Sequence, residues 1–155
     1  MKYDKYKFKF YLNARHAIYI NGVLGQSHPH TWEFSLDILK VWEKFVQFND
    51  VEKAIEELLS KYQNNFINEI EPFTRVNPTL ENICEYFKET LKKMLVDIGW
   101  VLMVIEISET PSRSYIIDLV DEVELQSSNA STSNTQGDNK SIDYVAQDIL
   151  DNMRK

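Results

Sequence analysis

The residues with the clearest potential for chemistry are the three histidines of the chain, His16, His28 and His30. Neutral imidazole is a good ligand for Zn²⁺. Three protein ligands leave a fourth coordination position for water or a substrate. If the fold makes these side chains converge, the sequence predicts a zinc site of the type found in catalytic rather than purely structural centres.

Two segments with alternating polarity contain these histidines. Apolar and polar residues alternate along residues 6–20 and again along residues 28–38, and the turn signal Asn21-Gly22 lies between them. Because successive side chains of a strand point to opposite faces, each segment predicts a strand with one buried face. The turn signal predicts that the two strands form an antiparallel hairpin.

All three histidines fall on the apolar parity of that hairpin. If Ala14 lies opposite Trp32, then His16 lies opposite His30, and His28 follows on the same face. The alternative is that these are isolated histidines, each satisfied by hydrogen bonds near a strand end. Three of three histidines on one face favour the metal site over that alternative.

The remaining pattern completes a mixed helix and sheet protein. Residues 51–66 and 80–98 have apolar residues at helical spacing, and residues 100–108 and 114–125 read as strands. Pro78-Thr79 precedes the second helix, Gly99 ends it, and Pro111 marks the turn between the last strands. The sequence therefore predicts an α+β fold, with a four-stranded antiparallel sheet and two helices packed on one face.

Composition restricts the class of protein. A net charge of −7 and the lack of a dominant basic cluster argue against nucleic-acid and membrane partners. A single cysteine excludes an internal disulfide and a cysteine-based metal cage. The amino terminus lacks the apolar core of a signal peptide, and no apolar run is long enough to span a bilayer. We therefore expect a cytoplasmic protein.

A change in composition near residue 126 predicts three parts. Residues 1–125 form the folded domain, and residues 126–141, rich in Ser, Asn and Thr, form a flexible linker. Apolar residues return at helical spacing over residues 142–155, which predicts a short amphipathic tail helix. Such a helix is marginal alone, so the tail is a candidate docking segment for a partner protein.

Four short motifs occur in order along the chain: Ala14-Arg15-His16, His28-Pro29-His30, Asn77-Pro78-Thr79-Leu80-Glu81-Asn82 and Glu109-Thr110. Together they resemble the 6-pyruvoyl- and 6-carboxytetrahydropterin synthase family over roughly residues 6–122. That family has Ala-x-His, His-Gly-His, Pro-Thr-x-Glu-Asn and Glu-Thr at these places. The resemblance implies the tunnelling fold, or T-fold, with the element order ββααββ.

The resemblance also implies ligands. It assigns Zn²⁺ to the three histidines and a pterin to a site that includes Glu109, whose carboxylate can accept two adjacent N–H groups at once. Thr110, Thr79 and Glu81 are further candidates for contacts with the pterin. Glu81 could equally be a helix-start residue that interacts favourably with the helix dipole. Family members assemble as trimers that stack into hexamers, so a homo-oligomer is implied.

The sequence departs from the family where the catalytic groups should be. Leu24 occupies the position of the family's cysteine, and Gln63 and Asn64 occupy those of its Asp-His pair. Neither amide can act as a general acid or base near neutral pH. Cys84 lies on an apolar helix stripe, where a free cysteine behaves as a small hydrophobe. Pro29 replaces the glycine between two histidines.

Two functions remain open. The first is a zinc-binding protein that acts on, or binds, a dihydroneopterin triphosphate-like pterin; if active, it would be a carbon–oxygen lyase of the tetrahydropterin synthase type. The second is a non-catalytic T-fold relative that serves as a ligand sensor, or as a scaffold for a protein bound by the tail.

Overall fold

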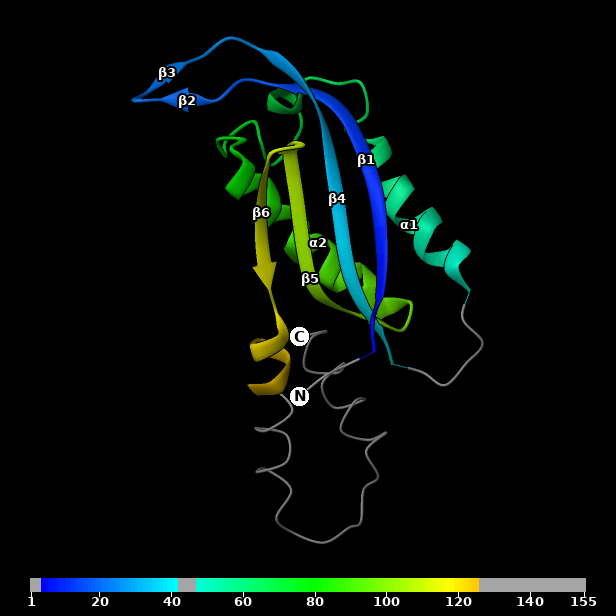
Figure 1. The fold of residues 1–155 in the computed structure, drawn as a ribbon. Helices are drawn as coiled ribbons and strands as arrows, with labels where there is room; N and C mark the ends of the chain where they lie inside the picture. The colour runs from blue at the N-terminus through cyan, green and yellow to red at the C-terminus, as the bar shows by residue number, and fades with distance from the viewer. Residues whose placement is uncertain (1–3, 42–46, 126–155) are drawn as a thin grey trace, which may run out of the picture.

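A computed structural model of the chain describes residues 4–41 and 47–125. Its strands are β1 (Tyr6–His16), β2 (Tyr19–Ile20), β3 (Val23–Leu24), β4 (His28–Lys40), β5 (Trp100–Thr110) and β6 (Arg113–Asp118). Its helices are α1 (Phe48–Ser60), the short 3₁₀ helix η1 (Ile67–Glu69) and α2 (Leu80–Asp97). β1, β4, β5 and β6 form one antiparallel sheet in the order β1-β4-β5-β6, and α1 and α2 lie on one side of it (Figure 1). The predicted α+β fold is confirmed.

The core lies between the sheet and the helices because the alternating strands place their apolar parity there. Trp32 and Phe34 of β4 are fully buried, as is Phe87 of α2. The rings of Phe34 and Phe87 meet edge to face, with centroids 5.0 Å apart. Aromatic pairs of this kind add to the stabilisation from burial, so they fix α2 against the middle of the sheet.

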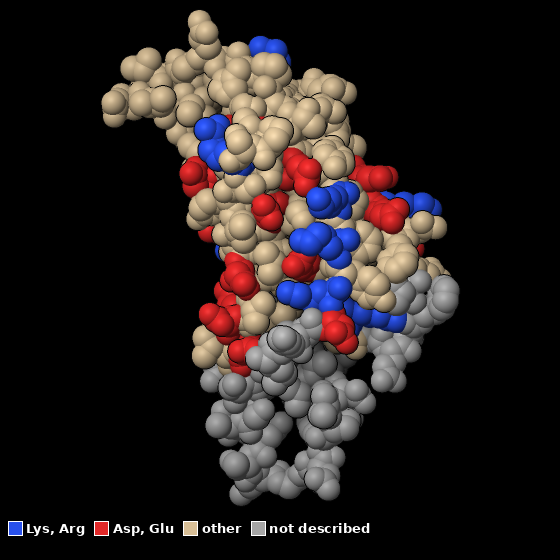
Figure 2. Space-filling view, viewed as in Figure 1, with Lys and Arg blue, Asp and Glu red and all other residues tan. Residues whose placement is uncertain are grey.

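The opposite face of the sheet carries paired charges over β1 and the first part of β4, whereas Val101 and Met103 of β5 are buried in a second, smaller apolar cluster. On β1 and β4, Lys7 lies 2.8 Å from Asp37 and Lys9 lies 3.3 Å from Glu33. Basic and acidic side chains lie next to each other over this face in Figure 2. Exposed ion pairs contribute little free energy, so the charged part of this face is a solvated surface.

The hairpin register differs from the prediction. Ala14 is opposite His30, not Trp32, and His16 is opposite His28. Residues 17 and 18 separate β1 from β2, whereas residues 25–27 separate β3 from β4. The connection from β3 to β4 is thus one residue longer than the connection from β1 to β2. This extra residue offsets the pairing of β1 with β4 by one residue from the pairing of β2 with β3. The histidines still share one face, because the shift relative to our prediction is two residues and side chains alternate with period two.

The first strand is also shorter than predicted. Its buried parity ends at His16 and Ala17, and Ile20 is 62% exposed. Residues 19–24 instead form a separate two-stranded arm that projects from the end of the sheet (Figure 1). Asn21 and Gly22 have φ of 50° and 77° at its tip. Positive φ at both central residues is the requirement of a type I′ turn, so the turn prediction is confirmed.

Two other predicted boundaries are wrong. The first helix ends at Ser60 rather than continuing to residue 66. The last strand ends at Asp118, and residues 120–125 are helical instead of extended. Asp118 explains the second change, because its carboxylate accepts a hydrogen bond of 2.9 Å from the Val120 N–H and so starts a helical turn. Leu119 and Val123, four residues apart, are both buried on that turn.

Side-chain amides attach the arm and the end of β1 to the rest of the molecule. Asn77 Oδ1 accepts from the Tyr19 N–H, and Asn77 Nδ2 donates to the Tyr19 carbonyl. Asn68 makes the same pair of bonds to Ala17, at 2.9 and 2.7 Å. Each side-chain amide therefore pairs with both backbone groups of one residue, as a neighbouring strand would. The pair at Ala17 fixes the backbone immediately after His16.

Substituting Asn68 with alanine should lower the free energy of unfolding by about 1–3 kcal/mol, because it leaves the partly buried backbone groups of Ala17 unpaired. Urea denaturation of metal-free protein measures the change. Asn49→Ala, at an exposed position in the first turn of α1, is the matched control and should stay within about 0.5 kcal/mol of the original chain. Equal effects for the two variants would contradict this role of Asn68.

Two further sequence predictions have different outcomes. Among the described residues, no helix is long and apolar enough to cross a membrane. The predicted linker at residues 126–141 and the predicted tail helix at residues 142–155 lie outside the described residues.

Candidate metal centre

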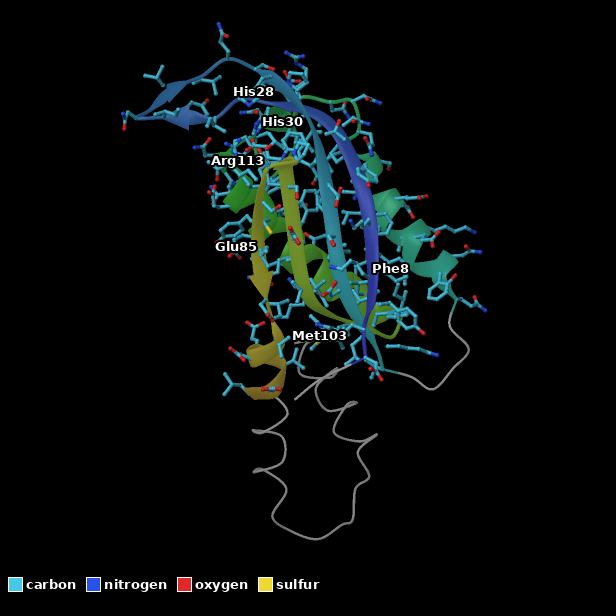
Figure 3. All side chains as sticks on the ribbon, viewed as in Figure 1. Phe8, His28, His30, Glu85, Met103 and Arg113 are labelled. Carbon is cyan, nitrogen blue, oxygen red and sulfur yellow. The ribbon has the colours of Figure 1, made fainter. Side chains whose placement is uncertain are left out.

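Three histidines and a glutamate converge at one end of the sheet. They are His16, the last residue of β1, His28 and His30 at the start of β4, and Glu109 near the end of β5. One ligand atom from each lies within 4.8 Å of those of the other three. Figure 3 shows His28 and His30 at the same end of the sheet as Arg113. This group of side chains, called the His₃Glu cluster below, could hold a metal ion.

Hydrogen bonds fix two of the imidazoles with Nε2 facing the cluster. His16 Nδ1 lies 2.8 Å from the Pro78 carbonyl oxygen, and His28 Nδ1 lies 3.0 Å from that of Gln26. Because a carbonyl oxygen can only accept, each Nδ1 carries the proton and donates it. In neutral rings both Nε2 atoms are then bare lone pairs. Such a second hydrogen bond is what normally orients a metal-bound histidine.

The two lone pairs face each other across a short distance. His16 Nε2 and His28 Nε2 are 2.9 Å apart. Two neutral acceptors at this separation repel each other unless a proton or a cation lies between them. A metal ion satisfies both atoms without changing either Nδ1 hydrogen bond.

The protonation state of His16 and His30 favours metal binding. Burial is the largest influence on His16 and His30, and it lowers the pKa of both below the ordinary value of 6.5. The nearby Glu109 carboxylate opposes this effect by raising the pKa of each. The net pKa is lowered, so both rings are neutral at pH 7. Metal binding requires neutral imidazole, and these two ligands need to lose no proton to bind a metal.

Glu109 lies closer to the histidines than the sequence led us to expect. Its Oε1 atom is 3.2 Å from both His16 Nε2 and His30 Nε2. Its Oε2 atom is 3.0 Å from Arg113 Nη2. Sequence reasoning assigned Glu109 to a pterin and missed its place in the His₃Glu cluster. The alternation of side chains along β5 could have revealed this place. Ser108 pairs with Glu33 on the polar face, so the next residue, Glu109, falls on the buried face.

The other predicted ligand-binding residues lie at the start of α2 and at the end of β5. Thr79 is the N-cap of α2, and its hydroxyl accepts a hydrogen bond of 3.2 Å from the Asn82 N–H. The preceding residue, Pro78, contacts His16, which brings the start of α2 against the cluster. Glu81 is exposed in the first turn of α2. Thr110 follows Glu109 at the end of β5.

Gln63 and Asn64, which the sequence comparison placed at the family's Asp-His positions, bond to the backbone of β1. Gln63 Nε2 donates to the Tyr11 carbonyl at 2.8 Å, and its Oε1 accepts from the Asn13 N–H at 2.9 Å. The N–H of Asn64, a residue with a positive φ of 60°, donates to the Asn13 carbonyl. Both residues therefore extend the pairing of β1 at its free edge. Leu24 is 44% exposed on the arm.

Cys84 is fully buried in the core. Burial is the main cause that raises the pKa of its thiol to about 12. The thiolate is the reactive form of cysteine, and it is negligible at pH 7 with such a pKa. Cys84 is therefore a small core residue and does not replace the family's catalytic cysteine.

A ββααββ protein with a four-stranded sheet and a His₃Glu cluster at one end of that sheet is a T-fold protein with a candidate metal centre. A family model described as 6-pyruvoyl tetrahydropterin synthase matches residues 5–119. The chain belongs to the 6-pyruvoyl tetrahydropterin synthase family. A comparison with curated protein sequences gave no match.

Solved structures with the same fold are found among tetrahydropterin synthases. The Caenorhabditis elegans 6-pyruvoyl tetrahydropterin synthase aligns with a TM-score of 0.64 at 17% identity, over 76% of this chain and 96% of that one. The Plasmodium falciparum 6-pyruvoyl tetrahydropterin synthase aligns with a TM-score of 0.54 at 16% identity, over 73% and 96%. An uncharacterised protein from Wolinella succinogenes aligns at 0.52 with 12% identity, over 74% and 98%. At these identities the likeness concerns the fold alone.

Proposed function

We propose that this chain is a zinc-binding tetrahydropterin synthase-like protein whose ligand is a pterin of the dihydroneopterin triphosphate type. The observation that carries the proposal is the pair of facing lone pairs on His16 and His28, held 2.9 Å apart by their Nδ1 hydrogen bonds. His30 supplies the third imidazole. Zinc fits this donor set because imidazole nitrogen is among its preferred ligands and it accepts tetrahedral geometry.

The chain's own residues would bind and orient the pterin. The carboxylate of Glu109 can accept two adjacent N–H groups of the pterin ring, a charge-assisted and orientation-specific contact. Thr110, next in the chain, and Thr79 at the start of α2 offer hydroxyls, and Glu81 offers a second carboxylate. A zinc ion, when bound, supplies Lewis-acid polarisation of oxygen atoms on the pterin side chain.

The alternative function is a non-catalytic T-fold relative that binds its ligand as a sensor or serves as a scaffold for a protein bound by its tail. Leu24 has no titratable group, and the side-chain amide of Gln63 already bonds to the β1 backbone. The resemblance implies that the family's proton transfers use a cysteine, or in some members a glutamate, together with an Asp-His pair at these positions. This observation favours ligand binding over the synthase reaction as the activity retained.

A homo-oligomer, a trimer or a hexamer, is part of the proposal, as is a cytoplasmic location. Within the described residues, β1 and β6 are the two outer strands of the sheet, and residues 63–65 already pair with part of the free edge of β1. An outer strand presents unpaired backbone groups that can pair with another chain. Sedimentation equilibrium of the full chain gives the number of subunits; a monomer at all concentrations would contradict this part.

The test of function uses zinc-loaded full-length protein and dihydroneopterin triphosphate. Binding is measured by calorimetry, and products are separated by chromatography. Product formation that is lost in His28→Ala would establish an enzyme. Binding without product would establish the sensor function. Zinc-loaded protein that neither binds nor converts the pterin would refute the pterin ligand and leave the scaffold function.

A further inference from the structure

Glu109 is positioned as a metal ligand in addition to its proposed role toward a pterin. Its Oε1 atom is 3.2 Å from His16 Nε2 and 3.2 Å from His30 Nε2. Ligand atoms about 2.0–2.2 Å from a tetrahedral zinc ion are about 3.3–3.6 Å from one another, as follows from the tetrahedral angle. The two distances from the carboxylate oxygen are therefore close to two edges of one coordination tetrahedron.

These contacts do not have the character of hydrogen bonds. His30 Nε2 is buried and has no hydrogen-bond partner, although Glu109 Oε1 lies 3.2 Å away. His16 Nε2 has no proton to donate in the neutral ring, because Nδ1 donates its proton to Pro78. A carboxylate oxygen that faces two imidazole nitrogens without hydrogen-bond geometry is unfavourable unless a cation lies among the three atoms.

Arg113 contacts the far side of the same carboxylate. Its Nη2 atom is 3.0 Å from Glu109 Oε2, across the turn between β5 and β6. One oxygen of Glu109 is thus directed at the histidines, while the other bonds to the guanidinium group of Arg113. The side chain of Glu109 is only 12% exposed, so water contributes little to the solvation of its charge, and the surrounding cations must supply it.

We propose that Glu109 is the fourth protein ligand of the resting metal centre, which is therefore a closed His₃Glu site without a bound water. This inference rests on the proposed metal binding by the three histidines. It has a consequence for the ligand: an incoming pterin must displace the carboxylate before its own oxygen can reach the metal. A closed site differs from the open three-ligand site that the sequence alone predicts.

The test uses Co²⁺, which takes the place of Zn²⁺ at such sites and has a visible absorption spectrum. Full-length protein is loaded with Co²⁺ and titrated with azide, a small anion that binds an open coordination position. The original chain should show no spectral change with azide. Glu109→Ala should show a clear change and should bind Co²⁺ at least about 10-fold more weakly.

Glu106→Ala is the matched control, because Glu106 lies on the same strand but on the opposite parity. It should behave like the original chain. If the original chain and Glu109→Ala respond equally to azide and bind Co²⁺ equally well, the fourth-ligand proposal is overturned while metal binding stands. If the original chain binds no Co²⁺, the metal proposal itself fails and this inference fails with it.

Discussion

Replacing His16 and His28 together with alanine should abolish stoichiometric zinc binding. A structural zinc site of four ligands contributes about 10–16 kcal/mol at pH 7, or roughly 2.5–4 kcal/mol for each ligand. Loss of two imidazoles should therefore weaken zinc binding by at least about 10⁴-fold. Mass spectrometry of protein purified without a histidine tag measures metal content, and competition with a chelator measures affinity. The original chain should contain about one zinc per chain.

The control for this experiment must change a neighbouring residue without touching the cluster. Arg15→Ala is suitable, because Arg15 has the opposite parity on β1 and its guanidinium bonds to Ser27. It should retain full zinc content. Since His16 is buried, the single variant His28→Ala guards against misfolding and should still lose about 100-fold in affinity. A double variant that retains one zinc per chain would place the metal elsewhere.

The largest effect on stability should come from Phe87→Ala. Phe87 is fully buried, and its ring contacts those of Phe34, Tyr62 and Tyr86 at centroid distances of 5.0, 5.3 and 5.2 Å. Truncating a buried phenylalanine costs about 3–5 kcal/mol, because it removes apolar burial and leaves a cavity. For a domain of this size the midpoint of thermal unfolding should fall by roughly 10 °C or more.

Urea denaturation in the presence of a chelator measures this loss without a contribution from metal. Ile116→Ala removes a side chain that is 57% exposed on β6 and is expected to cost less than about 1 kcal/mol. A loss below about 1 kcal/mol for Phe87→Ala would contradict the packing of α2 on the sheet.

The periodicity of the sequence was sufficient to predict which face each histidine occupies. Parity depends only on the alternation of side chains along a strand, and this alternation is regular through residues 6–16 and 28–38. The hairpin register was predicted wrongly, because it depends on how many residues lie in each connection to the arm. The prediction that the three histidines converge is still correct, because the actual register pairs His16 directly with His28.

Long-range contacts were beyond what periodicity could predict. Glu109 reaches the cluster through the pairing of β5 with β4, which depends on a register shift near Asp37 and Ile38. The hydrogen bonds of Gln63, Asn68 and Asn77 join segments that lie far apart in the chain. No local pattern identifies the partner of a side-chain amide. The motif at the start of α2 was recognised, but its contact with His16 through Pro78 was found only in the structure.

With a metal bound between His16 and His28 as proposed, thermal stability would become a measure of metal availability. A metal that binds only the folded chain shifts the unfolding equilibrium by mass action, by about 2.7 kcal/mol when free metal is 100 times its dissociation constant. In the cell, the small unfolded fraction of this chain would then fall as the free zinc concentration rises. Proteolytic degradation, which acts on the unfolded fraction, would be faster in zinc-starved cells than in zinc-replete ones.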